Sequence, residues 1–255
     1  MIDYHLHVIA HGDRPMTVEN ILRYCEVARA RGVSQMGITE HDRYLEEIDL
    51  AAFQEARELS HDVELRLGIE IDFVLGAEER MDNDATALPY DYVIGSVHRV
   101  DNEEVDRAMD QRIYDKYETY DLYEAYYANV RKAVLSGRFE VLGHPDLIKI
   151  FRHFPDRDIT PILEETADAV AESGVVVDVN AAGLRKPVGE IYPAHNFLEM
   201  FHRRGVPIIL SSDAHAPDQV AAGYEKSVKL VHDVGYREVV TFKDRERGTL
   251  ALRPE

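Results

Sequence analysis

Short apolar runs alternate along the chain with longer segments of helical periodicity. Apolar runs of about four to eight residues between turn signals are typical of buried strands. These runs predict strands at residues 2–5, 33–39, 64–71, 92–97, 141–142, 175–179 and 207–210. The periodic segments predict helices at residues 17–32, 45–60, 111–136, 161–173, 193–204 and 226–235.

Strands that alternate with helices imply parallel strands joined by right-handed crossover connections. About seven such strands are expected, and residues 238–242 around Val239 are a candidate eighth. A closed or nearly closed (β/α) barrel is the most economical architecture, with an open doubly wound sheet as the alternative. The sequence has no Pro/Ser-rich linker and no repeat, which indicates one domain over residues 1–255, and residues 77–88 are expected to form a solvated loop.

Composition and charge restrict the class of partner. The 255 residues carry a formal net charge of -19, so the surface should repel nucleic-acid phosphates and anionic membranes. Cys25 is the only cysteine, which excludes an internal disulfide and fits a reducing, cytoplasmic setting. Its place on the apolar stripe of a helix predicts a core residue and not a nucleophile. With no leader peptide and no long apolar run in the pattern, we expect a cytoplasmic protein that acts on a small molecule.

Histidine and carboxylate side chains stand at or near the ends of six predicted strands. The first strand runs into H-L-H, whose two imidazoles lie two residues apart and therefore point to the same side of a strand. In a β/α barrel the carboxyl ends of the strands converge on one face. We therefore expect eight side chains to meet in one cleft: His5, His7, His41, Glu70, His98, His144, Asp213 and His215.

Such a cluster predicts a metal centre. Burying this many imidazoles and two carboxylates without a cation would leave unpaired polar groups and repelling charges. Imidazole and carboxylate ligands suit Zn, Mn or Fe, and the lack of cysteine ligands argues against a structural zinc site. Eight ligands are too many for one tetrahedral ion, so we expect two or three divalent metal ions with Glu70 as a bridge.

The order of the motifs resembles the PHP (polymerase and histidinol phosphatase) superfamily. H-L-H, T-E-H-D, G-I-E, G-S-V-H, G-H-P-D and S-D-A-H follow one another over residues 3–215. G-H-P-D-L-I-K, and N-A-A-G-L-R-K-P followed by I-Y-P, are similar to the histidinol-phosphatase branch in particular. The resemblance implies a distorted (β/α)7 TIM-like barrel with a trinuclear metal centre.

The resemblance also implies how the metals share their ligands. One metal would be held by His5, His7, Glu70 and Asp213, a second by Glu70, His98 and His144, and a third by His41 and His215. Members of the family usually have a further histidine about six residues after H-x-H. Here His11 comes four residues after His7, and Asp13 occupies the six-residue spacing. We favour His11 as the ninth ligand, with Asp13 as the alternative.

A multi-metal centre suits phosphate chemistry, because it supplies hydroxide near neutral pH and neutralises phosphate oxygens. We expect a metal-bridging hydroxide to attack phosphorus, with Asp213 or His215 protonating the leaving alkoxide. Arg185 follows the sixth strand and is expected to clamp the phosphate, as the resemblance also implies, whereas Lys186 is expected to be peripheral. Further substrate-binding candidates are Asn180, Tyr192, Arg99 and Arg152. The resemblance implies hydrolysis of L-histidinol phosphate to L-histidinol and phosphate in histidine biosynthesis.

Other functions compete with this one. A phosphodiesterase or exonuclease of the same superfamily, or a phosphatase for another small phosphorylated metabolite, would suit the same metals. The acidic surface and the lack of an aromatic-plus-basic groove count against a nuclease. A non-enzymatic metal-dependent accessory or sensor module is opposed by the complete ligand set. We also expect Asp3, Asp42 and Asp146 to orient imidazoles, with a solvated position as the alternative for Asp42. The tyrosines of residues 114–127 are expected to pack in the core or at a homo-oligomer contact.

Overall fold

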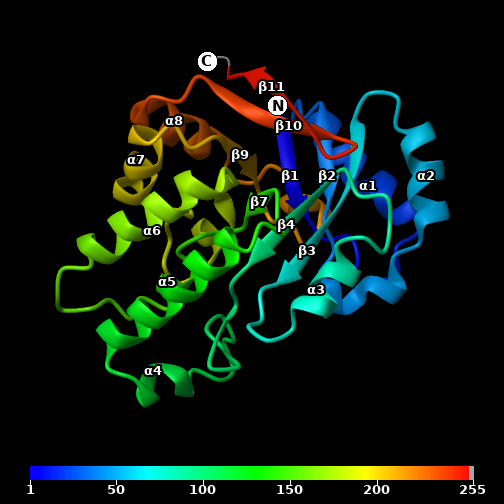
Figure 1. Cartoon of the computed structure of the whole chain (residues 1–255). Coiled ribbons are helices and arrows are strands. Elements are labelled where there is room, and N and C mark those ends of the chain that lie inside the picture. The colour runs from blue at the N-terminus through cyan, green and yellow to red at the C-terminus, as the bar shows by residue number, and fades with distance from the viewer. Residues whose placement is uncertain (253–255) are drawn as a thin grey trace.

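The computed structural model describes residues 1–252, so the last three residues of the expected domain lie outside the described part. Seven parallel strands form a barrel in the order β1-β2-β3-β4-β7-β8-β9 (Figure 1). They are β1 (Ile2–Leu6), β2 (Gln35–Ile38), β3 (Glu64–Asp72), β4 (Tyr92–Ser96), β7 (Val141–Leu142), β8 (Val176–Asn180) and β9 (Ile208–Ser211). A bridge between Leu6 and Ala214 brings the first strand beside the last. The expected (β/α)7 barrel is confirmed, and the open doubly wound sheet is wrong.

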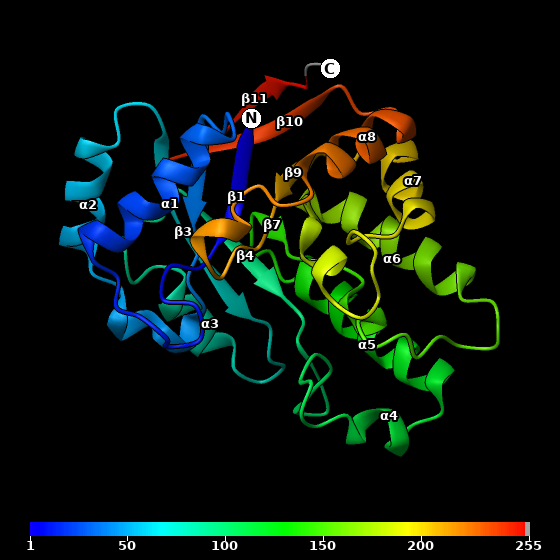
Figure 2. The same cartoon turned by 180° about the vertical axis from the view of Figure 1, so that it is seen from behind.

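Helices surround the barrel (Figures 1 and 2). They are α1 (Val18–Ala30), α2 (Leu50–Leu59), α3 (Glu78–Asp84), α4 (Arg112–Lys116), α5 (Thr119–Leu135), α6 (Thr160–Ser173), α7 (His195–Arg203) and α8 (Tyr224–Val234). The Thr17 side chain accepts a hydrogen bond from the Asn20 amide and begins α1, and Gly174 ends α6 in the left-handed conformation. Among residues 1–252, no helix has the length and apolar character needed to cross a bilayer.

The helix expected over residues 111–136 is broken into α4 and α5. Tyr117 has an extended backbone (φ -116°, ψ 148°), which ends α4 before α5 begins. The Tyr114 hydroxyl donates to one of two carbonyl oxygens within reach, those of Val105 at 2.8 Å and Ile148 at 3.0 Å. This hydrogen bond holds α4 against the segments around Val105 and Ile148, separately from α5. Helical periodicity alone does not reveal such a break.

Two further segments differ from the sequence prediction. The solvated loop expected over residues 77–88 contains the short helix α3, because Met81 is fully buried and pins it to the core. The helix expected over residues 45–60 begins only at Leu50, where the Asp49 side chain accepts a hydrogen bond from the Ala52 amide. A separate 3-10 turn (Asp42–Glu47) precedes it.

The candidate eighth strand does not join the barrel. β10 (Glu238–Lys243) pairs in antiparallel fashion with β11 (Glu246–Ala251), and this hairpin lies across the end of the barrel where β1 begins (Figure 1). Alternating Val240 and Phe242 turn one face of the hairpin inward, and both are buried. A second, short hairpin of β5 (Arg99–Val100) and β6 (Glu103–Glu104) was not predicted; it follows β4.

Aromatic rings fill the barrel beside the hairpin β10–β11. The ring of Tyr92 stacks on Tyr4 and on Phe242, with centroids 5.3 Å and 5.1 Å apart. The Tyr92 hydroxyl donates to the Tyr4 carbonyl oxygen at 2.6 Å. Gly37 makes room for this ring, because a Cβ there would lie 1.7 Å from the Tyr92 hydroxyl oxygen. This end of the barrel is therefore closed, which leaves the opposite end for a site.

Candidate metal centre

The carboxyl ends of the strands bring the eight side chains expected from the sequence together, at the end away from β10–β11. Six of them are at most 9% exposed, and the other two, from the segment after β9, are partly exposed. The residues are His5 and His7 from β1 and its end, His41 after β2, Glu70 in β3, His98 after β4, His144 after β7, and Asp213 and His215 after β9. Their convergence follows from the parallel register of the strands.

Glu70 stands at the centre of this cluster, and its two carboxylate oxygens face different histidines. Oε1 lies 3.1 Å from His144 Nε2 and 3.6 Å from His98 Nε2. Oε2 lies 2.8 Å from His41 Nδ1, 3.3 Å from His5 Nε2 and 3.5 Å from His7 Nε2. A carboxylate placed between two sets of imidazoles has the arrangement that a bridging ligand requires.

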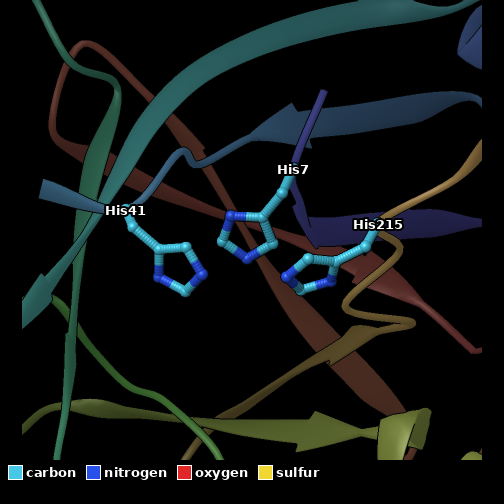
Figure 3. Close-up of side chains that lie close together, drawn as sticks. All are labelled: His7, His41 and His215. Carbon is cyan, nitrogen blue, oxygen red and sulfur yellow. The ribbon is translucent and has the colours of Figure 1, made fainter. Parts of the chain in front are cut away.

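The side chains form three groups, and within each group the ligand atoms lie within 4.8 Å of one another. The groups are His7, His41 and His215; His5, Glu70 and His144; and His5, His7 and Asp213. Figure 3 shows the first group, with three imidazoles from separate segments turned towards a common space. The grouping is close to the division of ligands implied by the family resemblance. It differs in placing His7 with His41 and His215, in placing His5 with Glu70 and His144, and in leaving His98 outside these three groups.

The donor atoms of the site fit a divalent cation. Both ring nitrogens of His7, and the Nε2 atoms of His41 and His215, are buried without a hydrogen-bond partner among the described residues. Unpaired buried polar atoms cost free energy, and most proteins avoid them. Imidazole nitrogens together with carboxylate oxygens are ligands that Zn, Mn and Fe accept. The residues present therefore suit one or more such ions.

Electrostatics set the protonation states of the groups in the cluster. Burial lowers the pKa of His7 well below its ordinary value, and it lowers the pKa of His215 to about 4 although Asp213 opposes the shift. Burial alone would raise the pKa of Glu70, but the nearby His5 and His41 and the hydrogen bond with His144 hold it well below its usual range. Near neutral pH, His7 and His215 are therefore neutral and Glu70 is ionised. Burial opposes protonation of His5 and His98, but nearby Glu70 and Asp72 raise the pKa of His5 well above its ordinary value and that of His98 to about 10.

Two carboxylates orient imidazoles of the cluster from behind. The Asp178 carboxylate lies 2.9 Å from His5 Nδ1, and the Asp72 carboxylate lies 2.6 Å from His98 Nδ1. Burial opposes ionisation of Asp72, but the neighbouring His98 lowers its pKa to about 2. Such contacts fix the ring orientation and the tautomer of a ligating histidine. Strand alternation was the missed signal, since Asp72 lies two residues after Glu70.

The sequence analysis assigned this orienting role to Asp3, Asp42 and Asp146, and that assignment is wrong. The Asp3 carboxylate accepts hydrogen bonds from Ser212 and Ala221. The carboxylate of Asp42 accepts from Arg80 and from the Asp72 amide. The Asp146 carboxylate lies 2.9 Å from Lys149 Nζ and accepts from the Ala194 amide at 2.7 Å. Each therefore fixes a turn or loop, and none of these bonds goes to an imidazole.

The structure brings His11 into the cluster. Its ring centroid lies 4.5 Å from that of His215 and 6.1 Å from that of His41. His11 also lines the cavity above the cluster, whereas Asp13 is not among the described residues that line it. The geometry thus favours His11 over Asp13 as a further ligand.

The cavity has a volume of about 560 Å³. Beyond the cluster it is lined by the cations Arg43, Arg107 and Lys186, by the acids Asp72, Glu104 and Asp106, and by Leu147, Ile150, Ala182 and Tyr192. The Tyr192 hydroxyl is buried without a hydrogen-bond partner among the described residues. Lys186, which sequence reasoning treated as peripheral, therefore faces the space where a substrate would bind.

Arg185 is engaged in a different way. Its Nη2 atom donates to the carbonyl oxygens of Ser212 at 2.7 Å and Asp213 at 3.0 Å. Arg185 is not among the described residues that line the cavity. These bonds support the turn that carries Asp213, whose backbone φ is 50°.

The remaining candidates lie around the site or away from it. The Asn180 amide nitrogen donates to Asp178 at 3.1 Å and to Asp213 at 3.3 Å, so it links two carboxylates of the site. Arg99 pairs with Glu104 at 2.7 Å beside the cavity, and Arg152 is exposed and does not line it. Cys25 is buried, which raises the pKa of its thiol to about 11 and makes it unreactive.

Known proteins resemble this chain along nearly its whole length. A family model described as PHP domain matches residues 3–182. A protein of Deinococcus radiodurans described as a probable histidinol-phosphatase is 35% identical, over 96% of this chain and 98% of that protein. A histidinol-phosphatase of Bacillus subtilis is 25% identical, over 88% of this chain and 96% of that protein.

A solved structure has the same fold. It is the crystal structure of histidinol phosphate phosphatase from Lactococcus lactis, complexed with zinc, L-histidinol and phosphate. The TM-score is 0.76, the sequence identity is 21%, and the match covers 97% of this chain and 98% of that one.

Proposed function

The chain belongs to the PHP domain family, and on that premise we propose that it is a metal-dependent phosphomonoesterase that hydrolyses L-histidinol phosphate to L-histidinol and phosphate. The observation that carries the proposal is the central carboxylate of Glu70, whose two oxygens face separate sets of imidazoles. The relatives named as histidinol-phosphatases support the choice of substrate. We also propose that residues 1–255 act as a single domain.

Two or three divalent ions (Zn, Mn or Fe) would be held by the nine side chains His5, His7, His11, His41, Glu70, His98, His144, Asp213 and His215. Bound there, such ions lower the pKa of coordinated water and neutralise charge on phosphate oxygens. Glu70 would serve two sites at once, which explains why its carboxylate lies between two groups of rings. Asp72 and Asp178 would keep His98 and His5 in the tautomers that present Nε2 to the ions.

The chain's other residues would bind and orient the substrate. Burial lowers the pKa of His11, and the neighbouring His41, Arg43 and Lys186 lower it further. Arg43 and Lys186 also line the cavity, so they offer positive charge at the rim of the cluster. Tyr192 offers a buried hydroxyl that lacks a partner. Asp213 has a pKa well below its usual value, chiefly because nearby His5 outweighs the effect of burial, and His215 likewise has a low pKa. Near neutral pH, an ionised Asp213 and a neutral His215 would therefore be available as metal ligands.

Phosphate release from L-histidinol phosphate tests the proposal directly. Protein reconstituted with Mn or Zn, with its metal content measured, is assayed beside p-nitrophenyl phosphate and a phosphate bis-ester. We expect a kcat/KM above about 10⁴ M⁻¹s⁻¹ for histidinol phosphate alone, within the ordinary range of enzymes. Preferred cleavage of the bis-ester would point to a phosphodiesterase. Bound metal without turnover of any ester would point to an accessory module.

Matched variants separate the possible phosphate-binding cations. We expect Lys186→Ala to raise KM for monoesters and to leave the metal content intact. If Arg185 clamps the phosphate, Arg185→Ala behaves in the same way, but if it only supports the Asp213 turn, the variant loses metal instead. Arg152→Ala is the control, because Arg152 is exposed and does not line the cavity. Normal kinetics in both Lys186→Ala and Arg185→Ala would remove these two residues from substrate binding.

A further inference from the structure

The barrel has a seam between β1 and β9, which lie side by side (Figure 2). The other neighbouring strands pair in ladders, but here the described residues contribute an isolated bridge between Leu6 and Ala214. The His7 amide donates to the Ala214 carbonyl oxygen at 2.8 Å. His7 and His215 thus lie on opposite sides of the seam, one residue beyond the bridge on each strand.

Two side chains outside the cluster connect the turns across this seam. The Arg14 Nη1 atom donates to the His215 carbonyl oxygen at 3.0 Å and to the Tyr24 hydroxyl at 2.7 Å. The Tyr24 hydroxyl in turn donates to the His7 carbonyl oxygen at 2.9 Å. Tyr24 is fully buried on α1, and Arg14 is partly buried in the segment before that helix. One arginine and one tyrosine therefore join the backbones of two candidate metal ligands.

Backbone placement matters here because few hydrogen bonds hold the rings themselves: among the described residues the His7 ring has none, and the His215 ring has one, from Nδ1 to the Asp213 carbonyl oxygen of its own turn at 3.1 Å. The imidazoles of His7 and His215 lie with centroids 4.4 Å apart, and no hydrogen bond among the described residues holds His7 Nδ1, His7 Nε2 or His215 Nε2. His41 completes the group shown in Figure 3. A shift of either turn along the seam would move one ring away from the other two.

We propose that Arg14 and Tyr24 are positioning residues that set the distance between His7 and His215, and so tune the affinity for the cation shared by His7, His41 and His215. The inference rests on the proposed metal centre. It assigns a role to residues that touch neither metal nor substrate. The ligands around Glu70 Oε1, on the other side of the cluster, are not fixed by these bonds, so their cation should be unaffected.

Tyr24→Phe tests the proposal, because it removes one hydroxyl and keeps the ring in the core. Zn²⁺ affinity is measured by competition with a chromophoric chelator, and the number of bound ions by equilibrium dialysis. We expect one class of ion to bind about ten- to a hundred-fold more weakly, as is typical when an outer partner of a ligand is removed. The ion on the Glu70 Oε1 side, beside His98 and His144, should keep its wild-type affinity. Tyr90→Phe is the matched control, because Tyr90 is also buried and its hydroxyl has no partner among the described residues.

Arg14 provides the second arm of the experiment. Arg14→Met should weaken the same class of ion, and Arg14→Lys should restore part of the affinity because it keeps a cationic donor. The double variant Tyr24→Phe/Arg14→Met should be little worse than Arg14→Met, since both act through one chain of hydrogen bonds.

Two results would overturn the inference. One is unchanged affinity in Tyr24→Phe and Arg14→Met. The other is an equal loss for every ion together with a lower urea midpoint, which would mean a general loss of stability. A wild-type protein that binds no divalent ion would instead refute the proposed function, and this inference with it.

Discussion

The two ends of the barrel are built from the same strands but satisfy their polar atoms in opposite ways. At the end covered by β10–β11, the Tyr92 hydroxyl donates to a backbone oxygen and its ring packs against Tyr4 and Phe242. At the other end, the nitrogens of His7 are buried without hydrogen bonds among the described residues. β4 shows the contrast within a few residues, since it begins at Tyr92 and leads to His98.

The difference separates stability from chemistry. Paired polar groups and stacked rings stabilise the fold whether or not a ligand is present. Unpaired imidazoles around an ionised carboxylate destabilise it until a cation binds, and this is the cost that a functional site carries. We therefore expect substitutions at the end covered by β10–β11 (the hairpin end) to change stability and leave cation binding unchanged. Substitutions at the end with the histidine cluster (the metal end) should change cation binding and leave stability largely unchanged.

The largest effect should come from Glu70→Gln, which preserves the side-chain volume and removes the central negative charge. Both sets of imidazoles lose the carboxylate that they share. We expect loss of at least one bound ion and a fall in kcat/KM of about 10³-fold, measured by metal analysis and phosphate release. The control is Glu104→Gln, a cavity carboxylate that pairs with Arg99 outside the cluster. Equal effects of the two variants would contradict the assignment of Glu70 as the ligand shared by the two sets of imidazoles.

Tyr92→Ala, at the hairpin end, should lower stability and leave metal binding unchanged. Removing a fully buried ring leaves a cavity beside Tyr4 and Phe242, at a cost of about 4 kcal/mol in unfolding free energy. Tyr92→Phe keeps the ring and should lose only about 1 kcal/mol with the hydrogen bond. Urea unfolding gives both values, and metal content per folded molecule should match the wild type. A loss of metal that parallels the loss of stability would mean that the two ends are coupled.

The sequence predicted the metal end better than the details around it. Strand-end histidines are recognisable because parallel register carries every strand's carboxyl end to one face, so the eight side chains could be found without coordinates. The orienting roles of Asp72 and Asp178 were missed because they depend on which face of each strand turns inward. Arg185 is the last residue of a 3-10 turn and Lys186 follows it, and only three-dimensional packing decides which of them lines the cavity.

The hairpin end was harder to predict for a related reason. Residues 238–242 have the β-branched and aromatic residues typical of a strand, but composition does not say which partner the strand takes. Phe242 packs on Tyr92, more than a hundred residues away in sequence, and this contact places the hairpin across the barrel instead of in its wall. The helix α3 was missed for a similar reason: its segment is acidic, and the burial of the single Met81 side chain fixes it against the core.

Alkaline pH should lower the stability of the fold, and Tyr4 at the hairpin end should contribute to this loss. Burial raises the pKa of Tyr4 to about 12, against about 10 in an unfolded chain. The folded state keeps a proton that the unfolded state releases, so this contribution is complete below pH 10 and is lost as the pH rises towards 12. Two pKa units correspond to on the order of 2 kcal/mol. Urea midpoints between pH 9 and 11.5 should fall less steeply in Tyr4→Phe than in the wild type, and equal slopes would contradict the assignment.

The smallest effect is expected for Lys149. Its polar group has hydrogen-bond partners, as the polar groups at the hairpin end do, but it lies beside the metal end. Its Nζ is buried 2.9 Å from Asp146, 3.2 Å from Glu190 and 3.1 Å from the Ile191 carbonyl oxygen, and 5.3 Å from the Tyr192 ring centroid.

These bonds hold the segment that presents the unpaired Tyr192 hydroxyl to the cavity, so Lys149→Met should let that wall move. We expect KM for histidinol phosphate to rise about ten-fold, with metal content unchanged and kcat nearly so, and Lys149→Arg should recover part of the loss. Lys116→Met is the control, because Lys116 pairs with Glu103 on the exposed surface. A fall in metal content in Lys149→Met would show instead that hydrogen-bonded groups beside the cluster also help to hold the metal ligands in place. The contrast between the two ends of the barrel would then apply only to the ligands themselves.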